Sequence, residues 1–308
     1  MKRALAALGL CLFIGVAPAA RRAENTVASA PAGRPDAVVE AAVMKCLADM
    51  PDHQYFIGHR EIVDKLLAGE PMLIVDIRQP DAYAKGHLRG AVNLPFGPVL
   101  AQSLGRLPRA GEVFVYCYSG QSSAQTVMLL NALGVPARSV TYGWNLGISK
   151  VEGAAAVTVS EPSELSADQA CPTTPSVLEA CEAYYDQLIA GRGTRFAGNM
   201  IGEADAKALL DAKDGTALFV ATQSPEEFAK GRIEGALNIP WGKGVDRLVA
   251  GLPKDKKLVV YCGSGQRSGL LVAALRLMGL DAVSLRNGLG TPGNYPAGWV
   301  AKGYSLVQ

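Results

Sequence analysis

The stretch VFVYCYSGQSS at residues 113–123 decides the fold, because it recurs as LVVYCGSGQRS at residues 258–268. Each copy runs from an apolar segment, through a cysteine, into a loop of small residues. The two cysteines, Cys117 and Cys262, lie 145 positions apart (262 − 117). An unbroken apolar segment of this length is typical of a strand buried on both faces of a parallel sheet. Each of the two copies therefore predicts a buried strand followed by a tight loop and a helix.

The same offset aligns residues on both sides of this stretch without an insertion or deletion. The aligned pairs are Pro80 with Pro225, Gly86 with Gly231, Gly90 with Gly235, Asn93 with Asn238, Pro95 with Pro240, Gly120 with Gly265, Gly134 with Gly279 and Gly143 with Gly288. This agreement indicates a duplicated domain, because the period is far too long for a solenoid repeat.

Apolar strands and helical stretches alternate within the first copy. We predict helices over residues 57–67, 80–85 and 124–133, and strands over 72–75, 91–94, 113–116 and 139–142. Buried strands separated by helices predict an α/β fold with a mainly parallel sheet that is flanked by helices on both faces. The whole chain is therefore expected to hold two tandem domains of this class.

The remaining segments set the expected domain bounds. Residues 1–20 combine Lys2 and Arg3 with a short apolar run and small residues, as in a cleaved signal peptide. We expect a flexible segment over residues 21–40, a first domain over 41–152, a linker over 153–175 and a second domain over 176–308. The signal predicts a periplasmic protein with no stable membrane insertion after cleavage.

Composition limits the partners of the chain. With 30 Lys and Arg against 28 Asp and Glu, the net charge is +2 and no basic block stands out. Nucleic acid is therefore not expected as a partner. The sequence specifies no protein partner.

Cleavage of the signal would leave five cysteines: Cys46, Cys117, Cys171, Cys181 and Cys262. Cys171 and Cys181 are compatible either with a small disulfide-closed loop or with a buried helical cysteine at position 181. None of the cysteine spacings resembles a zinc site and the three histidines do not cluster with them, so we expect no metal and no other cofactor.

The position of Cys117 and Cys262 has a chemical consequence. Where a parallel strand gives way to a helix, successive backbone N–H groups can turn toward one point and form a cup for an anion. Gly120 and Gly265 permit the backbone torsions that such a tight loop needs. A cysteine in the cup is favoured as the thiolate, which is the nucleophilic form.

On these residues both copies resemble rhodanese domains. The first copy carries the resemblance most fully, in VDIR (75–78), GHLRGAVN (86–93) and the loop 117–123. The resemblance implies a sulfurtransferase in which the loop cysteine takes the outer sulfur of a donor such as thiosulfate, becomes a persulfide, and passes that sulfur to a thiol or to cyanide. It assigns catalysis to Cys117 and Cys262. The substrate-binding loops are then Tyr118, Ser119, Gly120, Gln121 and Ser122 in the first copy, and Gly263, Ser264, Gly265, Gln266 and Arg267 in the second.

The second copy departs from the family pattern. Asp76 and Arg78, to which we assign a supporting role, are replaced by Ala221 and Gln223. The resemblance also implies an ion pair between the arginine of this motif and a glutamate four residues later. Each copy keeps only one of these two residues, Arg78 in the first and Glu227 in the second.

Arg267 adds a cation to the second loop, whereas the first loop carries none. We therefore expect Cys262 to have the lower KM for thiosulfate. An exposed charge contact contributes roughly 1 kcal/mol, which corresponds to a several-fold effect on apparent affinity. His87, replaced by Arg232 in the second copy, is expected to lie in a turn away from the cysteine.

Two other functions compete with this interpretation. Phosphatases and arsenate reductases that share this domain need an arginine after five intervening residues, where this chain has Ser123 and Ser268. The second alternative is a non-catalytic sulfur carrier or partner-binding module, at least in the second domain. Formation of a persulfide that depends on the donor would separate it from an enzyme.

Overall fold

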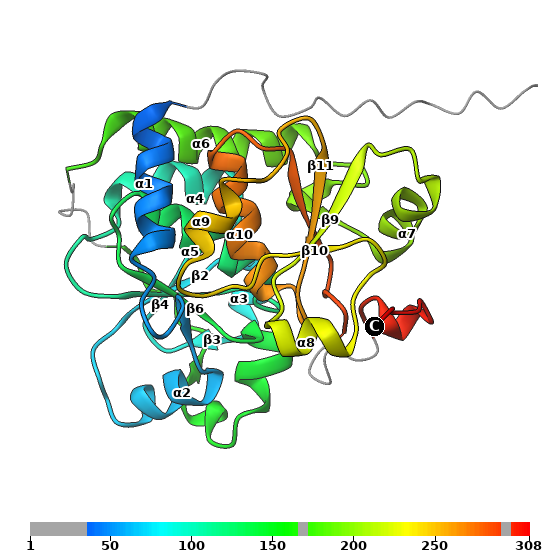
Figure 1. Ribbon diagram of the computed structural model, residues 1–308. Helices are drawn as coiled ribbons and strands as arrows, with labels where there is room; N and C mark the ends of the chain where they lie inside the picture. Colours follow the sequence, from blue (N-terminus) through cyan, green and yellow to red (C-terminus); the bar gives the residue numbers. More distant parts are fainter. Residues whose placement is uncertain (1–35, 166–171, 291–296) are drawn as a thin grey trace, which may run out of the picture.

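The computed structural model describes residues 36–165, 172–290 and 297–308, and it contains two parallel sheets of five strands each (Figure 1). The strand order is β1-β6-β5-β2-β4 in the first sheet and β8-β12-β11-β9-β10 in the second. These orders are equivalent under the 145-residue repeat. The prediction of two tandem α/β domains, each with a parallel sheet, is therefore confirmed.

The strands of the first sheet are β1 (Phe56–Ile57), β2 (Leu73–Asp76), β4 (Ala91–Asn93), β5 (Val113–Tyr116) and β6 (Ala137–Val140). Those of the second are β8 (Met200–Ile201), β9 (Ala217–Ala221), β10 (Leu237–Asn238), β11 (Lys257–Tyr261) and β12 (Ala282–Leu285). A short antiparallel ribbon joins β3 (His87–Leu88) to β7 (Thr158–Val159).

The helices of the first half are α1 (Ala37–Ala48), α2 (His59–Leu67), α3 (Pro80–Ala84), α4 (Pro98–Ser103) and α5 (Gln121–Ala132). Those of the second half are α6 (Pro175–Ala190), α7 (Glu203–Ala212), α8 (Pro225–Lys230), α9 (Val245–Val249) and α10 (Gln266–Leu277). Short helical turns follow β6, at η2 (Gly143–Gly147), η3 (Ile148–Lys150) and η4 (Ala154–Val157). The others are η1 (Leu104–Arg106), η5 (Ala197–Asn199) and η6 (Val300–Lys302).

Several predicted bounds shift for local reasons. Helix α5 begins at Gln121 rather than at residue 124, because Gly120 is left-handed (φ 92°) and ends the loop there. Strand β6 ends at Val140, since Tyr142 is also left-handed (φ 60°) and turns the chain away from the sheet.

Two of the expected segments contain regular structure. Helix α1 begins at Ala37, so the expected flexible segment over residues 21–40 is wrong for residues 37–40; its earlier part, like the signal peptide, lies outside the described residues. Asp36 caps this helix by accepting a hydrogen bond from the backbone N–H of Val38 at 2.7 Å. In the range expected as a linker, β7 pairs with β3 of the first domain.

A single hydrophobic cluster fills the space between the two sheets. It takes Val75 and Val115 from the first sheet and Val220 and Val260 from the second. It also includes buried residues of α1, α5, α6 and α10, and Figure 1 shows α5 and α10 between the two sets of strands. The two domains therefore share this central cluster, besides a separate buried cluster in each domain, and are not independent globules.

Helices α5 and α10 form the centre of this shared layer, and ten of the twelve residues in each are buried. Gly269 of α10 comes so close to α5 that a Cβ there would lie 2.7 Å from the carbonyl oxygen of Gln121. Any larger residue would push the helices apart. Among the described residues, no helix is long and apolar enough to cross a membrane.

Candidate active site

Cys117 lies at the junction between β5 and α5, where the sequence placed it. Its Sγ accepts hydrogen bonds from the backbone N–H groups of Gly120, at 3.1 Å, and Ser123, at 3.4 Å. The side chain is almost fully buried. Two peptide dipoles and the first turn of a twelve-residue helix thus point at the sulfur, which favours a negative charge there.

Cys262 occupies the equivalent junction between β11 and α10. Its Sγ accepts a hydrogen bond from the backbone N–H of Gly265 at 3.1 Å, and the Ser268 hydroxyl lies 3.8 Å away. Gly265 is left-handed (φ 86°), as Gly120 is in the first loop. Both loops therefore have the expected strand–loop–helix geometry, but two backbone N–H groups donate to Sγ at Cys117 and only one at Cys262.

Each cysteine loop packs against the backbone of a glycine that follows the next strand. Gly143 has a positive φ (56°), and a Cβ there would lie 2.4 Å from the carbonyl oxygen of Cys117. Gly288 is its counterpart (φ 60°), with a corresponding approach of 2.2 Å to the carbonyl oxygen of Cys262. Both positions were visible as repeat anchors, but the sequence did not reveal that they support the cysteine loops.

The two loops interlock across the domain interface through a glutamine from each. The Gln121 side chain accepts a hydrogen bond from the backbone N–H of Asn287 at 3.3 Å, and Gln266 accepts one from that of Tyr142 at 2.9 Å. Gln121 is further held because its Nε2 donates to the Leu285 carbonyl oxygen, at 3.0 Å. Each cysteine loop thus positions part of the other domain.

Gln121 also begins a buried chain of polar groups that leads to Cys262. Its Nε2 donates to the Ser284 hydroxyl at 2.7 Å, and that hydroxyl lies 2.8 Å from the Ser268 hydroxyl beside Sγ. In the first domain, Ser123 and Ser139 make the equivalent contact at 2.9 Å.

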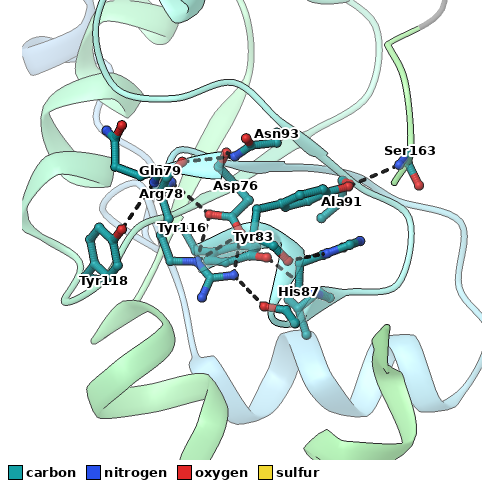
Figure 2. A network of polar contacts seen from close by, with 12 residues as sticks. Asp76, Arg78, Gln79, Tyr83, His87, Ala91, Asn93, Tyr116, Tyr118 and Ser163 are labelled. Atoms are coloured by element: carbon teal, nitrogen blue, oxygen red, sulfur yellow. Dashed lines mark hydrogen bonds and ion pairs between the residues drawn. The ribbon is translucent and has the colours of Figure 1, made fainter. Parts of the chain in front are cut away.

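The supporting pair of the first domain is buried beside its loop (Figure 2). Arg78 makes a bidentate ion pair with Asp76, with Nη2 at 2.6 Å from Oδ2, and it also donates to the Gly86 carbonyl oxygen at 2.8 Å. Burial alone would lower the pKa of Arg78, but the hydrogen bonds and charge of Asp76 outweigh it and raise that pKa. The partner of Arg78 is therefore Asp76, in a copy that has Ala82 where the family pattern has a glutamate.

Aromatic side chains connect this pair to the Cys117 loop. The guanidinium carbon of Arg78 lies 4.3 Å from the centre of the Trp144 ring. The Tyr118 hydroxyl accepts a hydrogen bond from the backbone N–H of Gln79 at 3.2 Å (Figure 2). Ser119 and Ser122 are half-buried in the same loop. Tyr118 thus connects the first loop to its own domain, in addition to the contacts that Gln121 makes across the interface.

A cavity of about 700 Å³ opens in front of Cys262. The second domain lines it with the loop residues Gly263, Ser264, Gln266 and Arg267, among others. Its opposite wall comes from the first domain, through residues 52–54, Phe56, Thr141 and Tyr142. The sequence could not reveal this wall, because nothing in it shows which distant segment faces a given loop.

Arg267 lines this cavity but is not a free cation. Its Nη1 lies 3.5 Å from Oε2 of Glu227, and both side chains are about half exposed. Glu227 thus pairs with the loop arginine and also completes a capping box with Ser224 at the start of α8. The expected electrostatic advantage of Cys262 is therefore partly offset by Glu227.

The remaining charged candidates lie in structural positions. The ring of His87 is buried and stacked on Tyr83, and its nitrogens lie 2.9 Å from the Tyr83 carbonyl oxygen and 3.0 Å from that of Glu161 (Figure 2). In the second domain, Arg232 places its guanidinium carbon 5.0 Å from the centre of the Phe228 ring.

The other described cysteines differ from the two loop cysteines. Cys181 is a free thiol buried in α6, which fits the buried-helix interpretation; Cys171 lies outside the described residues. Burial raises the pKa of Cys181, and burial likewise raises that of Cys46 to about 11. Both thiols are therefore poor nucleophiles near neutral pH.

The chain is similar to several known proteins. A family model described as a rhodanese-like domain matches residues 59–149 and 203–290. A Mycobacterium tuberculosis protein provisionally named thiosulfate sulfurtransferase SseB is 26% identical over 272 residues, covering 74% of this chain and 90% of that protein. Thiosulfate sulfurtransferase PspE of Escherichia coli is 33% identical over 61 residues, covering 20% of this chain and 59% of its own length. The crystal structure of the 3-mercaptopyruvate sulfotransferase SseA from Escherichia coli matches with a TM-score of 0.36 at 20% identity, covering 76% of this chain and 98% of that one.

The buried ion pair of the first domain gives a stability prediction. Asp76→Ala leaves the Arg78 guanidinium buried without a counter-charge, which should cost about 3–5 kcal/mol of unfolding free energy. A second change, Arg78→Gln, recreates the Ala221 and Gln223 of the second domain and should recover most of the loss. Urea denaturation followed by circular dichroism measures both.

Asp211→Ala, which breaks the exposed pair with Lys207, is the control and should cost less than about 1 kcal/mol of unfolding free energy. If Asp76→Ala costs no more than this control, the pair is not a support of the domain.

Proposed function

Because the chain belongs to the rhodanese-like family and is a sulfurtransferase of that type, we propose that it moves sulfane sulfur through persulfides on Cys117 and Cys262. The observation that carries the proposal is the pair of buried thiols, each at the junction of a parallel strand and a helix, with two backbone N–H donors to Sγ at Cys117 and one at Cys262. The proposed donor is thiosulfate or another sulfane compound, and the acceptor is a thiol or cyanide.

The same backbone donors would serve each step. The thiolate attacks the outer sulfur of thiosulfate, the S–S bond breaks, and sulfite leaves with the bonding electron pair. The persulfide that remains is also anionic near neutral pH, so the N–H groups that favour the thiolate favour it as well. An acceptor thiolate or cyanide then attacks the outer sulfur and regenerates the cysteine thiolate.

The first prediction for this function concerns sulfur loading. Incubation of the full chain with thiosulfate should add one sulfur atom to Cys117 and one to Cys262, as measured by intact and peptide mass spectrometry. Each Cys→Ser change should remove one addition, and the double variant should lose thiosulfate:cyanide turnover. The full chain is used because the two domains share the central cluster. Turnover by the double variant at the wild-type rate would show that the sites are elsewhere.

The outcome for Cys262 also separates an enzyme from a sulfur carrier. A Cys117→Ser variant that takes sulfur on Cys262 but fails to release it to cyanide or to a thiol would indicate a storage domain. Release with turnover would indicate two catalytic sites.

The second prediction concerns the ion pair at the Cys262 cavity. With Cys117→Ser as background, Glu227→Gln should lower the KM for thiosulfate and Arg267→Ala should raise it. Each effect should be at most about fivefold, because both charges are partly exposed and screened by salt. Gln keeps the capping function of Glu227. Steady-state kinetics at low and high salt measure the effect, with Glu226→Gln on the same helix as the control. Identical KM values in all variants would show that Arg267 does not act on the bound donor.

The third prediction concerns location. We propose export to the periplasm, supported by the charged start, short apolar run and small residues of residues 1–20. N-terminal sequencing of the protein from fractionated cells should find a chain that begins shortly after Ala19 or Ala20. An uncleaved chain in the cytoplasm would contradict this proposal.

A further inference from the structure

The two cysteine sites differ most at three positions that the repeat makes equivalent. The first domain has Arg78, Tyr118 and Trp144 where the second has Gln223, Gly263 and Leu289. All three replacements in the second domain are smaller, and all three line the cavity in front of Cys262.

In the first domain the larger side chains occupy the corresponding space. The Arg78 guanidinium stacks on the Trp144 ring and is fixed by Asp76. Trp144 in turn lies over Tyr116, with 6.0 Å between ring centres. The hydroxyl of Tyr118 is held by the backbone N–H of Gln79. These contacts hold Arg78 and Trp144 in place, and the hydrogen bond from Gln79 orients the partly exposed Tyr118 beside them.

In the second domain the volume left open suits a larger molecule than thiosulfate. A cavity of about 700 Å³ falls within the range of ~300–1,000 Å³ that is typical of sites for drug-sized ligands. Phe56, Leu289 and Leu306 give it apolar walls. Arg267 and Glu227 both line this cavity, so it carries a positively and a negatively charged side chain.

We propose that the two cysteines divide sulfur transfer by substrate size. Cys262 exchanges sulfur with peptide-sized thiols that carry both charge signs, whereas Cys117 serves small donors and acceptors. The small residues Gly263 and Leu289 admit the larger substrate at Cys262. At Cys117 their equivalents, Tyr118 and Trp144, exclude it. This inference rests on the proposed function, because it assigns substrates to the same persulfides.

The step at Cys262 requires no further reagent. The thiolate of the peptide thiol attacks the outer sulfur of the Cys262 persulfide. The S–S bond breaks, its electron pair stays on Sγ, and the outer sulfur leaves as the persulfide of the acceptor.

The test compares how glutathione and cyanide discharge a persulfide from each site. Cys117→Ser reports on Cys262, and Cys262→Ser reports on Cys117. The ratio of the glutathione rate to the cyanide rate should be roughly tenfold higher at Cys262, because bulk excludes glutathione from Cys117. Gly263→Tyr with Leu289→Trp should lower the ratio at Cys262 several-fold, and Tyr118→Gly should raise it at Cys117.

A bulky substitution elsewhere provides the matched control. Leu248→Trp makes the same leucine-to-tryptophan change as Leu289→Trp, but at an exposed position of α9. It should leave the ratio of the glutathione rate to the cyanide rate at Cys262 unchanged. Equal ratios at the two cysteines, or a ratio at Cys262 that does not respond to Gly263→Tyr with Leu289→Trp, would overturn the proposal.

A second measurement separates this proposal from the proposed function. If neither cysteine accepts sulfur, the proposed function fails. The space at each site is still measured by the alkylation rates with iodoacetamide and with its fluorescein derivative. The rate ratio of the large reagent to the small one should again be higher at Cys262, and the reverse order would overturn the assignment of the larger site.

Discussion

The close contact between the first turns of α5 and α10 is the constraint on which the rest of the structure depends. A Cβ on Gly120 would lie 2.6 Å from the Gln266 side chain, and one on Gly265 would lie 2.8 Å from that of Gln121. The two cysteine loops are therefore neighbours, with the positive ends of two helix dipoles close together. Each loop gains rigidity from the other domain as well as from its own, which keeps the N–H donors directed at sulfur before any substrate arrives.

Much of this arrangement can be predicted from the sequence, because it depends on local physics that is repeated. The apolar segments before Cys117 and Cys262 identify the central strands, and Gly120 and Gly265 identify the turn that starts each helix. The Asp76–Arg78 ion pair was not predicted, because the direction of the two side chains at the end of β2 cannot be read from the sequence. The Arg267 contact was missed because Glu227 lies 40 residues away in the chain, and only the fold brings it to 3.5 Å. The wall of the Cys262 cavity was also missed, since no repeat or motif identifies a face supplied by the other domain.

The two sites are stabilised in different ways, although their backbones are nearly equivalent. The Cys117 loop adjoins a side-chain network of its own domain, formed by Tyr118, Arg78 and Trp144, and also contacts the other domain through Gln121. At Cys262 the equivalent positions are too small to form such a network, and Gln121 adds a polar contact from across the interface to those of the second domain's own loop. Its amide reaches Ser284 and through it Ser268, beside the sulfur. Loss of the buried ion pair in the second domain is therefore accompanied by a contact that only the tandem arrangement supplies.

This dependence explains why the repeat in the sequence does not mark two separable units. The cluster between the sheets takes apolar residues from both copies, and α1, which precedes the first copy, packs against both α5 and α10. Cutting the chain between the copies would expose this apolar layer to water and remove one wall of the cavity. It would also take Gln121 from the Cys262 site. Because a buried apolar layer and a buried amide are both costly to expose, each copy is expected to be less stable alone than in the pair. The smallest unit that holds a complete Cys262 site is therefore the tandem pair, whereas the side-chain network around Cys117 lies within one domain.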